Sequence, residues 1–163
     1  MKAMKVRELI TIDVKSCRPH TDLAEAAVKM WENDCGALPV VDGEGKVIGL
    51  ITDRDIAIAL GTRDRPASQV AVGDVISGRA YCCSLDDDVK AALKTMRQEK
   101  VRRLPVVNDS GALQGILSLN DIVLRAEEPK GKKASGLSYE EVVSTVKAIS
   151  EHRTLEESSA TGA

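Results

Sequence analysis

A tandem repeat is the feature that most constrains this chain. Residues 6–59 align with residues 72–125 without a gap when the sequence is displaced by 66 positions. Fourteen of these 54 pairs are identical, and apolar positions largely map onto apolar positions elsewhere. The longest identical run is Leu-Pro-Val-Val, at residues 38–41 and 104–107. Such a duplication predicts two copies of one supersecondary unit, which must pack together to bury their hydrophobic faces.

Within each copy, the hydrophobic period first predicts a helix. Apolar residues recur at helical spacing over residues 23–30 and again over residues 89–96. Asp22 and Asp88 precede these runs, where a carboxylate accepts hydrogen bonds from the first free amides of a helix. We therefore expect each copy to contain an amphipathic helix with an aspartate N-cap, preceded by a short strand.

A β-hairpin and a second helix complete each unit. Apolar runs flank turn sequences at residues 42–45 and 108–111, which predicts the hairpins. Second helices are expected at residues 54–60, ended by Gly61 and the linker at residues 62–66, and at residues 120–126. The predicted fold is α/β of the α+β kind: two tandem β-α-β-β-α units packed face to face about a pseudo-twofold axis, with ligand-sized grooves between them.

The expected domain organisation follows from these units and from composition. It comprises a first repeat at residues 4–61, a linker at 62–70, a second repeat at 71–127, a flexible linker at 128–137, a C-terminal helix at 138–153 and a disordered tail at 154–163. Ser138 and Glu141 have the spacing of a capping box, which supports the C-terminal helix.

Composition excludes several classes of function. The 23 Lys and Arg residues against 25 Asp and Glu give a net charge of −2, so no overall basic field attracts nucleic acid or an anionic membrane. Aromatic residues make up only 2% of the chain, too few for a platform that stacks single-stranded bases. The sequence has no apolar run of membrane-spanning length and no signal-type segment. We expect a cytoplasmic protein.

The sequence contains no pattern of an enzyme or of a metal centre. It has no P-loop, no paired-carboxylate motif and no nucleophile beside a base, so we expect no catalytic activity. Four cysteines lack Cys-x-x-Cys spacing, and only two histidines are present, so we expect no metal. Cys17 and Cys83 are equivalent by the repeat; small buried residues are the favoured interpretation, and a redox or metal sensor is the alternative.

Each hairpin is predicted to end in a turn that can bind an anion. The pattern Gly-apolar-apolar-Thr/Ser-x-x-Asp occurs at residues 49–55 and 115–121. Free amides and the positive end of a helix dipole suit a phosphate, and the aspartate can accept from both hydroxyls of a ribose. The same Thr/Ser-x-x-Asp spacing forms a capping box that stabilises a helix without any ligand. The motif alone leaves both interpretations open.

The duplication, the two Leu-Pro-Val-Val strands and these turns together resemble a CBS domain pair, or Bateman module, over about residues 4–127. The resemblance, to stand-alone bacterial or archaeal members, implies a disc-like pseudo-symmetric fold, often dimeric. It implies two clefts that in many members bind AMP, ADP, ATP or S-adenosylmethionine, whereas many other members have no known ligand. A regulatory adenine-nucleotide sensor is therefore the first interpretation. The alternative is an interaction or dimerisation module with empty clefts.

The resemblance also assigns site residues by position. Sugar and phosphate positions are matched by Thr52, Arg54, Asp55, Ser118, Asn120 and Asp121. Adenine would be packed by Thr11, Val14, Gly36 and Ala37 in a cleft at Asp121, and by Ser77, Ala80, Val101 and Arg102 in a cleft at Asp55.

Two adjacent arginines distinguish the copies. Arg102 and Arg103 resemble the basic pair that holds phosphates in family members, and the first copy has Gly36 and Ala37 there. We therefore expect the cleft at Asp121 to bind phosphates more tightly. An arginine at the boundary between the copies can also reach the other cleft.

Partners are predicted less specifically. Trp31 falls just off the apolar stripe of its helix, where its counterpart in the second copy is Arg97. Together with the short apolar second helices, this residue predicts a homodimer. A small-molecule nucleotide and an unidentified protein partner are the other expected contacts.

Overall fold

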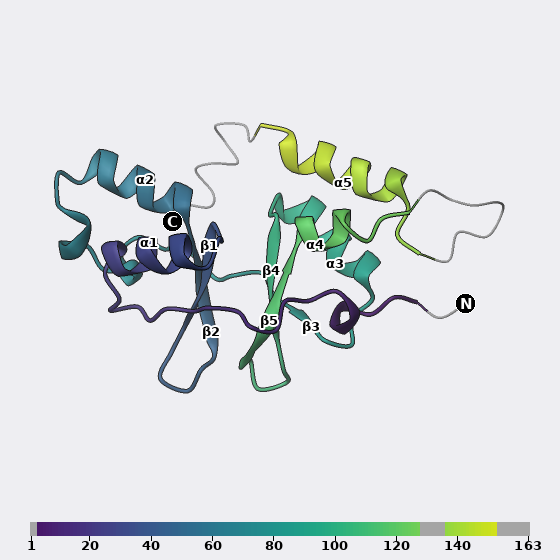
Figure 1. Ribbon diagram of the computed structural model, residues 1–163, viewed down its shortest axis with the longest axis horizontal. Helices are drawn as coiled ribbons and strands as arrows, with labels where there is room; N and C mark the ends of the chain where they lie inside the picture. Colours follow the sequence, from purple (N-terminus) through teal and green to yellow (C-terminus); the bar gives the residue numbers. More distant parts are fainter. Residues whose placement is uncertain (1–2, 128–135, 153–163) are drawn as a thin grey trace.

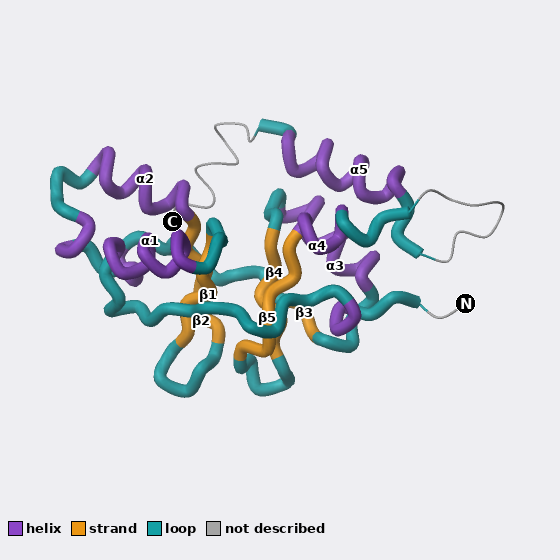
Figure 2. Tube along the Cα trace, in the orientation of Figure 1, coloured by secondary structure: helices purple, strands orange, loops and turns teal. Residues whose placement is uncertain are grey.

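The computed structural model describes residues 3–127 and 136–152 of the chain (Figure 1). The two copies lie side by side, each with a hairpin flanked by helices, and the hairpins have their turns at the same end (Figure 2). The amide of Val47 donates to the Gly111 carbonyl at 3.0 Å, and the amide of Leu113 donates to the Gly45 carbonyl at 3.1 Å. The predicted α+β fold with two repeats is confirmed.

The first helices form as predicted. They are α1 (Leu23–Glu32) and α3 (Val89–Glu99). The Asp22 carboxylate accepts from the amide of Glu25 at 2.9 Å, and the Asp88 carboxylate accepts from the amide of Lys90 at 2.8 Å. Both helices bury the apolar stripe that follows the cap, so one carboxylate at the start of each helix fixes both its position and its inward face.

The two hairpins have the same pairing, including the same shift of register. Strand β1 (Ala37–Val41) pairs antiparallel with β2 (Val47–Thr52), and β4 (Arg103–Val107) pairs with β5 (Leu113–Ser118). The register shifts at the fourth position of Leu-Pro-Val-Val in both copies. The strand expected before each first helix is minimal: β3 (Cys83–Ser84) lies parallel to β4, and in the first copy a single bridge joins Cys17 to Val40.

The second helices differ from the prediction. Helix α2 (Asp53–Thr62) runs through Gly61, so the prediction that this glycine ends it is wrong, and the helix ends instead at the first residue of the predicted linker. Asp64 adopts a left-handed conformation with φ 46°, which turns the chain after the C-cap Arg63 and performs the role expected of the glycine. Helix α4 (Leu119–Val123) is only five residues long and ends before the predicted residue 126.

A C-terminal helix, α5 (Tyr139–Ser150), begins with the predicted capping box. The Ser138 hydroxyl accepts from the amide of Glu141, and the Glu141 carboxylate accepts from the amide of Ser138. The predicted flexible linker falls mostly, and the predicted disordered tail wholly, outside the described residues. Within the described ranges, no helix is long and apolar enough to cross a membrane.

Each core contains a segment from the other copy. The core around α3 and the second hairpin includes Val6 of the short helical turn η1 (Val6–Glu8) and Leu9, its C-cap, and Figure 1 shows this N-terminal segment beside α3. The core around α1 and the first hairpin includes Val70, the C-cap of η2 (Ala67–Gln69) at the end of the linker, and Val72, the first residue of η3 (Val72–Asp74). Neither core is complete without the other copy's leading segment.

Two equivalent glycines allow these segments to cross the hairpins. The amide of Thr11 donates to the Ile116 carbonyl, and the amide of Ile116 donates to the Thr11 carbonyl, both at 3.1 Å. A Cβ at Gly115 would lie 2.7 Å from that Thr11 carbonyl oxygen. At Gly49, a Cβ would lie 2.7 Å from Cδ1 of Ile76, the end of a side chain that can rotate. The two glycines are therefore equivalent in the repeat, but an added side chain is tolerated less well at Gly115 than at Gly49.

This inequality gives a stability test. We expect Gly115→Ala to lower the free energy of unfolding by about 1–3 kcal/mol, because a hydrogen-bonded backbone oxygen must move, and Gly49→Ala to lower it by less. Urea denaturation of both variants measures the difference. Equal losses would show that the crossing of residue 11 over the second hairpin is not closely packed.

Candidate functional site

Two clefts lie at the predicted turns, where the copies meet. The Asp55 cleft has a volume of about 860 Å³ and is lined by Leu50, Thr52, Asp53, Arg54, Asp55, Ile58, Lys100, Val101, Arg102, Arg103, Ile149, Ser150, Glu151 and His152. The Asp121 cleft has a volume of about 300 Å³ and is lined by Thr11, Asp13, Val14, Lys15, Asn33, Asp34, Cys35, Gly36, Ala37, Arg103, Ile116, Ser118, Asn120 and Asp121. Each cleft thus combines the turn of one copy with the chain before the hairpin of the other.

The turn at the Asp55 cleft is a complete capping box. The Thr52 amide and hydroxyl both donate to Oδ2 of Asp55 at 2.8 Å, and the Asp55 amide donates to the Thr52 hydroxyl at 3.2 Å. Among the described residues, no donor reaches Oδ1 of Asp55. The capping role and the ligand role are therefore compatible, because one oxygen holds the helix and the other can accept from a sugar hydroxyl.

The second turn repeats this geometry. The Ser118 amide and hydroxyl donate to Oδ2 of Asp121 at 2.8 and 2.6 Å, and the Asp121 amide donates back to the hydroxyl at 3.2 Å. The helices that follow differ: α2 has ten residues and α4 only five. Because the helix dipole sums over aligned peptides, the Asp55 turn has the stronger field for an anion.

Most of the predicted site residues line the expected clefts. The Asp121 cleft contains Thr11, Val14, Gly36, Ala37, Ser118, Asn120 and Asp121, and the Asp55 cleft contains Thr52, Arg54, Asp55, Val101 and Arg102. Ser77 and Ala80 are not among the described residues that line the Asp55 cleft. The equivalent residues of the first copy are Thr11 and Val14, and a β-bridge between Thr11 and Ile116 holds that segment on the second hairpin. Among the described residues, Ser77 forms no such bridge with the first hairpin, so the two equivalent segments pack differently.

The structure separates the two arginines that were expected to serve the Asp121 cleft together. Arg102 lines the Asp55 cleft, and Arg103 lines both clefts. Arg103 begins β4, and its Nη2 lies 3.4 Å from the position of a Cβ on Gly36, so the missing side chain of Gly36 leaves room for the guanidinium. Arg102 is one residue earlier, and neighbouring side chains in an extended chain point to opposite sides. Arg102 therefore lies at the Asp55 cleft, where it was also expected beside Val101, and it does not join Arg103 at the Asp121 cleft.

The balance of charge between the clefts reverses as a result. The Asp55 cleft has four basic residues, Arg54, Lys100, Arg102 and Arg103, and three carboxylates, Asp53, Asp55 and Glu151. The Asp121 cleft has two basic residues, Lys15 and Arg103, and three carboxylates, Asp13, Asp34 and Asp121. Within the described ranges, no carboxylate forms an ion pair with the arginines of either cleft. The Asp55 cleft therefore has the more positive lining of the two.

Sequence reasoning missed several residues of the Asp55 cleft: Leu50, Asp53, Ile58, Lys100 and the end of α5. Lys100 directly precedes Val101 and Arg102, so its inclusion could have been predicted from the basic run. The residues from Ile149 to His152 at the end of α5 lie outside the duplication, and nothing in their pattern indicates a cleft.

The cysteines are separated from this chemistry. Burial raises the pKa of Cys17 to about 11, with smaller opposing effects of Lys29 and Glu25, and raises the pKa of Cys83 to about 12, with further increases from Asp87 and Cys82. All four cysteines are free thiols. Among the described residues, no group of three or more His, Cys, Asp or Glu could hold a metal ion.

Thiol titration tests whether these cysteines are sensors. A pKa raised by two pH units or more lowers the thiolate fraction about 100-fold, so we expect Cys17 and Cys83 to react at least that much more slowly at pH 8 in the folded protein than in denaturant. Reaction with a chromogenic disulfide, followed by mass spectrometry, resolves the sites. Rapid native reaction of both would support the redox alternative.

Comparison with known protein families identifies both copies. The family described as "CBS domain" matches residues 6–62 and 72–128. An uncharacterized protein of Methanopyrus kandleri is 32% identical over 123 residues, which are 76% of this chain and 63% of that protein, so this chain spans less than two thirds of it. The CBS domain-containing protein YhcV of Bacillus subtilis is 33% identical over 84% of this chain and 97% of its own length.

One enzyme also matches, over a minor part of its length. The inosine-5′-monophosphate dehydrogenase of Methanocaldococcus jannaschii is 33% identical over 129 residues, which are 79% of this chain but only 25% of the enzyme.

Solved structures share the fold. A CBS domain pair in complex with 5′-methylthioadenosine and S-adenosyl-L-methionine superimposes with a TM-score of 0.69 at 24% identity, covering 76% of this chain and 95% of that one. CBSX2 in complex with AMP superimposes with a TM-score of 0.64 at 25% identity, covering 74% of this chain and 93% of that one.

Proposed function

Because this chain belongs to the CBS domain family, we propose that it is a non-catalytic regulatory module that binds an adenine nucleotide in the clefts between its two copies. The observation that carries the proposal is the Asp55 cleft. There, arginines without a carboxylate partner among the described residues stand beside an aspartate with one unused oxygen. The family relatives solved with AMP or with S-adenosyl-L-methionine support an adenine-containing ligand.

The cleft offers a partner for each part of a nucleotide. Oδ1 of Asp55 can accept from ribose hydroxyls, as the free oxygen of the capping box. The start of α2, with Arg54 beside it, and Arg102 across the cleft can bind phosphate by charge-assisted hydrogen bonds. Apolar surface from Leu50 and Val101 can cover the base. The Asp121 cleft provides the same sugar site with a weaker phosphate site.

The proposal does not include the chemistry of the matching dehydrogenase. This chain corresponds to a quarter of that enzyme, so the similarity concerns the CBS pair alone. A sensor of this kind acts through the conformation that its ligand favours, which a protein partner then recognises.

Nucleotide calorimetry tests the assignment of the clefts. We expect Asp55→Ala and Arg102→Ala each to weaken the tighter AMP-binding event at least about tenfold, or 1.4 kcal/mol, because each removes a direct hydrogen-bond partner. Asp121→Ala should affect only a weaker event. Arg125→Ala is the matched control, because Arg125 is an exposed arginine that lines neither cleft.

The opposite ranking would reassign the tight site. If Asp121→Ala abolishes the tighter event while Asp55→Ala leaves it intact, the charge argument fails. If AMP, ADP, ATP and S-adenosylmethionine all give no heat at millimolar concentration, the interaction module becomes the better description.

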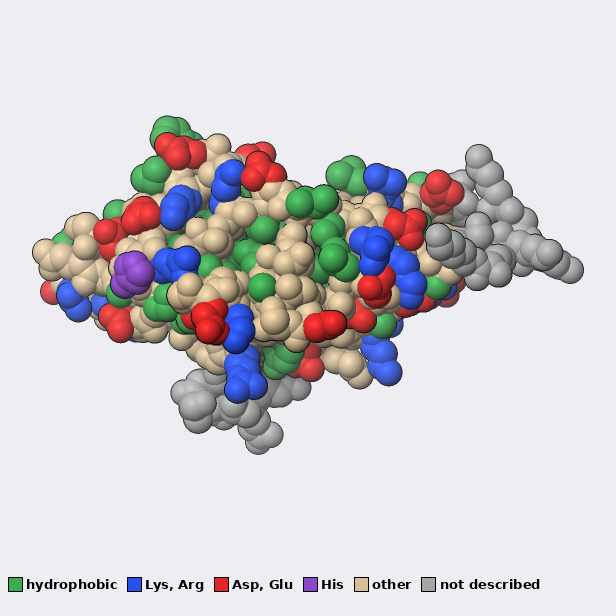
Figure 3. Space-filling model, turned by 90° about the horizontal axis from the view of Figure 1, so that it is seen from below, with side chains coloured by type: hydrophobic (Ala, Val, Ile, Leu, Met, Phe, Trp, Pro, Cys, Tyr) green, Lys and Arg blue, Asp and Glu red, His purple; other side chains and the backbone are tan. Residues whose placement is uncertain are grey.

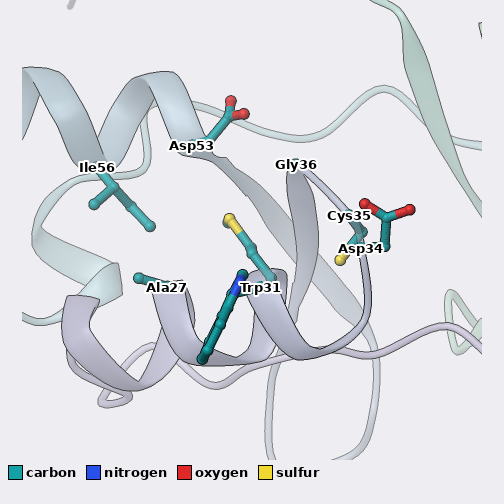
Figure 4. A pocket seen from close by; sticks show the side chains of 8 residues that line it. Ala27, Trp31, Asp34, Cys35, Gly36, Asp53 and Ile56 are labelled. Carbon is teal, nitrogen blue, oxygen red and sulfur yellow. The ribbon is translucent and has the colours of Figure 1, made fainter.

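A groove between α1 and α2 is the observation that favours an interaction module, and the interaction that it favours is a homodimer. It has a volume of about 460 Å³ and is lined by Ala27, Met30, Trp31, Asp34, Cys35, Gly36, Asp53 and Ile56 (Figure 4). The side chain of Trp31 is 84% exposed at its edge. The equivalent face of the second copy is covered by α5, so only the first copy leaves this surface open among the described residues. We propose that a second copy of the chain covers it.

Sedimentation tests the dimer. We expect Trp31→Ala to raise the dimer dissociation constant at least about tenfold, because aromatic side chains dominate the energetics of such contacts. Tyr139→Ala is the matched control, since Tyr139 is a half-exposed aromatic residue at the start of α5. If the wild-type protein sediments as a monomer at tens of micromolar, with and without AMP, the proposal of a homodimer is wrong.

A further inference from the structure

Helix α5 reaches into one of the two clefts. Its last turn and the two residues beyond it, Ile149, Ser150, Glu151 and His152, line the Asp55 cleft. Among the described residues, none from α5 lines the Asp121 cleft. The duplication therefore supplies an internal comparison: two equivalent turns, of which one faces an element that has no counterpart in the repeat.

The position of α5 is fixed by contacts with the second copy. Figure 1 shows the helix lying across α3 and α4, with its C-terminal end directed toward the first copy. Val142 belongs to the core of the second copy, and Ile149 packs against that core while also lining the cleft. Arg97 donates to the hydroxyl of the buried Thr145 at 3.0 Å, so the helix is held by polar as well as apolar contacts.

An ion pair adds to this docking. Nζ of Lys90 on α3 lies 2.8 Å from Oε1 of Glu141. Burial opposes ionisation of Glu141, but hydrogen bonds from Lys90 and Ser138 outweigh it and lower its pKa. Glu141 is therefore charged at neutral pH, and its ion pair with Lys90 helps to hold the first turn of α5 against α3.

The part of α5 that meets the cleft is negative. The last carbonyl groups of a helix have no partners within the helix and carry about half a negative charge in total. Glu151, the C-cap, adds a full negative charge and is exposed. The same cleft is lined by Lys100, Arg102 and Arg103, of which Arg102 is proposed to bind phosphate. Each negative charge added to the phosphate of a ligand in the Asp55 cleft is attracted by these basic residues and repelled by the end of α5.

We propose that the docked end of α5, through Glu151 and the helix carbonyls, makes the Asp55 cleft discriminate against adenine nucleotides of higher phosphate charge, so that it lowers the affinity for ATP relative to AMP. The inference rests on the proposed function, since it concerns the ligand of the same cleft. By this proposal Glu151 is a specificity-determining residue of the Asp55 cleft. Among the described residues, α5 contributes no such side chain to the Asp121 cleft.

The expected size follows from Coulomb's law. A unit charge about 8 Å away in a water-like dielectric changes binding about twofold per ligand charge. Without magnesium, ATP carries about two more negative charges than AMP at neutral pH. Removing the charge of Glu151 should therefore improve ATP binding about fivefold relative to AMP, and the effect should shrink as salt is raised because the charges are exposed.

The test compares two variants of the full chain that each also contain Asp121→Ala, so that the Asp55 cleft dominates binding. Glu151→Gln removes the charge at the cleft with little change of shape. Glu140→Gln, the matched control, removes the same charge at the other end of α5, where it lines neither cleft. Calorimetry at low salt with EDTA gives the dissociation constants for AMP and ATP in each protein.

The reference is the protein with Asp121→Ala alone. Relative to it, we expect the ratio of the ATP to the AMP dissociation constant to fall about fivefold in Glu151→Gln and to stay unchanged in Glu140→Gln. An unchanged ratio in Glu151→Gln, or an equal fall in both variants, overturns the charge discrimination and leaves the proposed function intact. Absence of binding of both nucleotides in all of these proteins overturns the proposed function and this inference with it.

Discussion

The exchange of leading segments between the two copies is the contact on which the other features depend. Val6 and Leu9 complete the core of the second copy, and Val70 and Val72 complete the core of the first. The exchange joins the two copies at their cores, and hydrogen bonds between the hairpin turns join them a second time. The clefts are a consequence, because each is built from the turn of one copy and the pre-hairpin chain of the other.

Pseudo-symmetry then fixes what the clefts share, and departures from it fix how they differ. Both contain a capping box in which one oxygen of the aspartate holds the helix, and the other has no hydrogen-bond donor among the described residues. The longer α2, the basic residues before β4 and the end of α5 all fall on the Asp55 side. The face seen in Figure 3 has basic and acidic side chains interspersed. The net charge of −2 likewise provides no overall attraction for an anion, so the proposal assigns phosphate binding to the local charges of the cleft.

The sequence predicted the features that local rules determine. Caps at Asp22 and Asp88, both hairpins and the two capping boxes follow from spacing alone. The end of α2 was mispredicted because Asp64 adopts the left-handed conformation that glycine usually supplies.

Features that depend on tertiary contacts were beyond local rules. The cleft that Arg102 faces depends on how β4 meets the first copy. The place of α5 depends on its docking to α3, which no periodicity within the helix specifies.

A crystal structure of the protein grown with AMP tests the central claim most directly. The account predicts nucleotide density in the Asp55 cleft, with the ribose hydroxyls on Oδ1 of Asp55 and the phosphate within hydrogen-bond distance of Arg102. Density only in the Asp121 cleft, or in neither cleft at millimolar AMP, would contradict it.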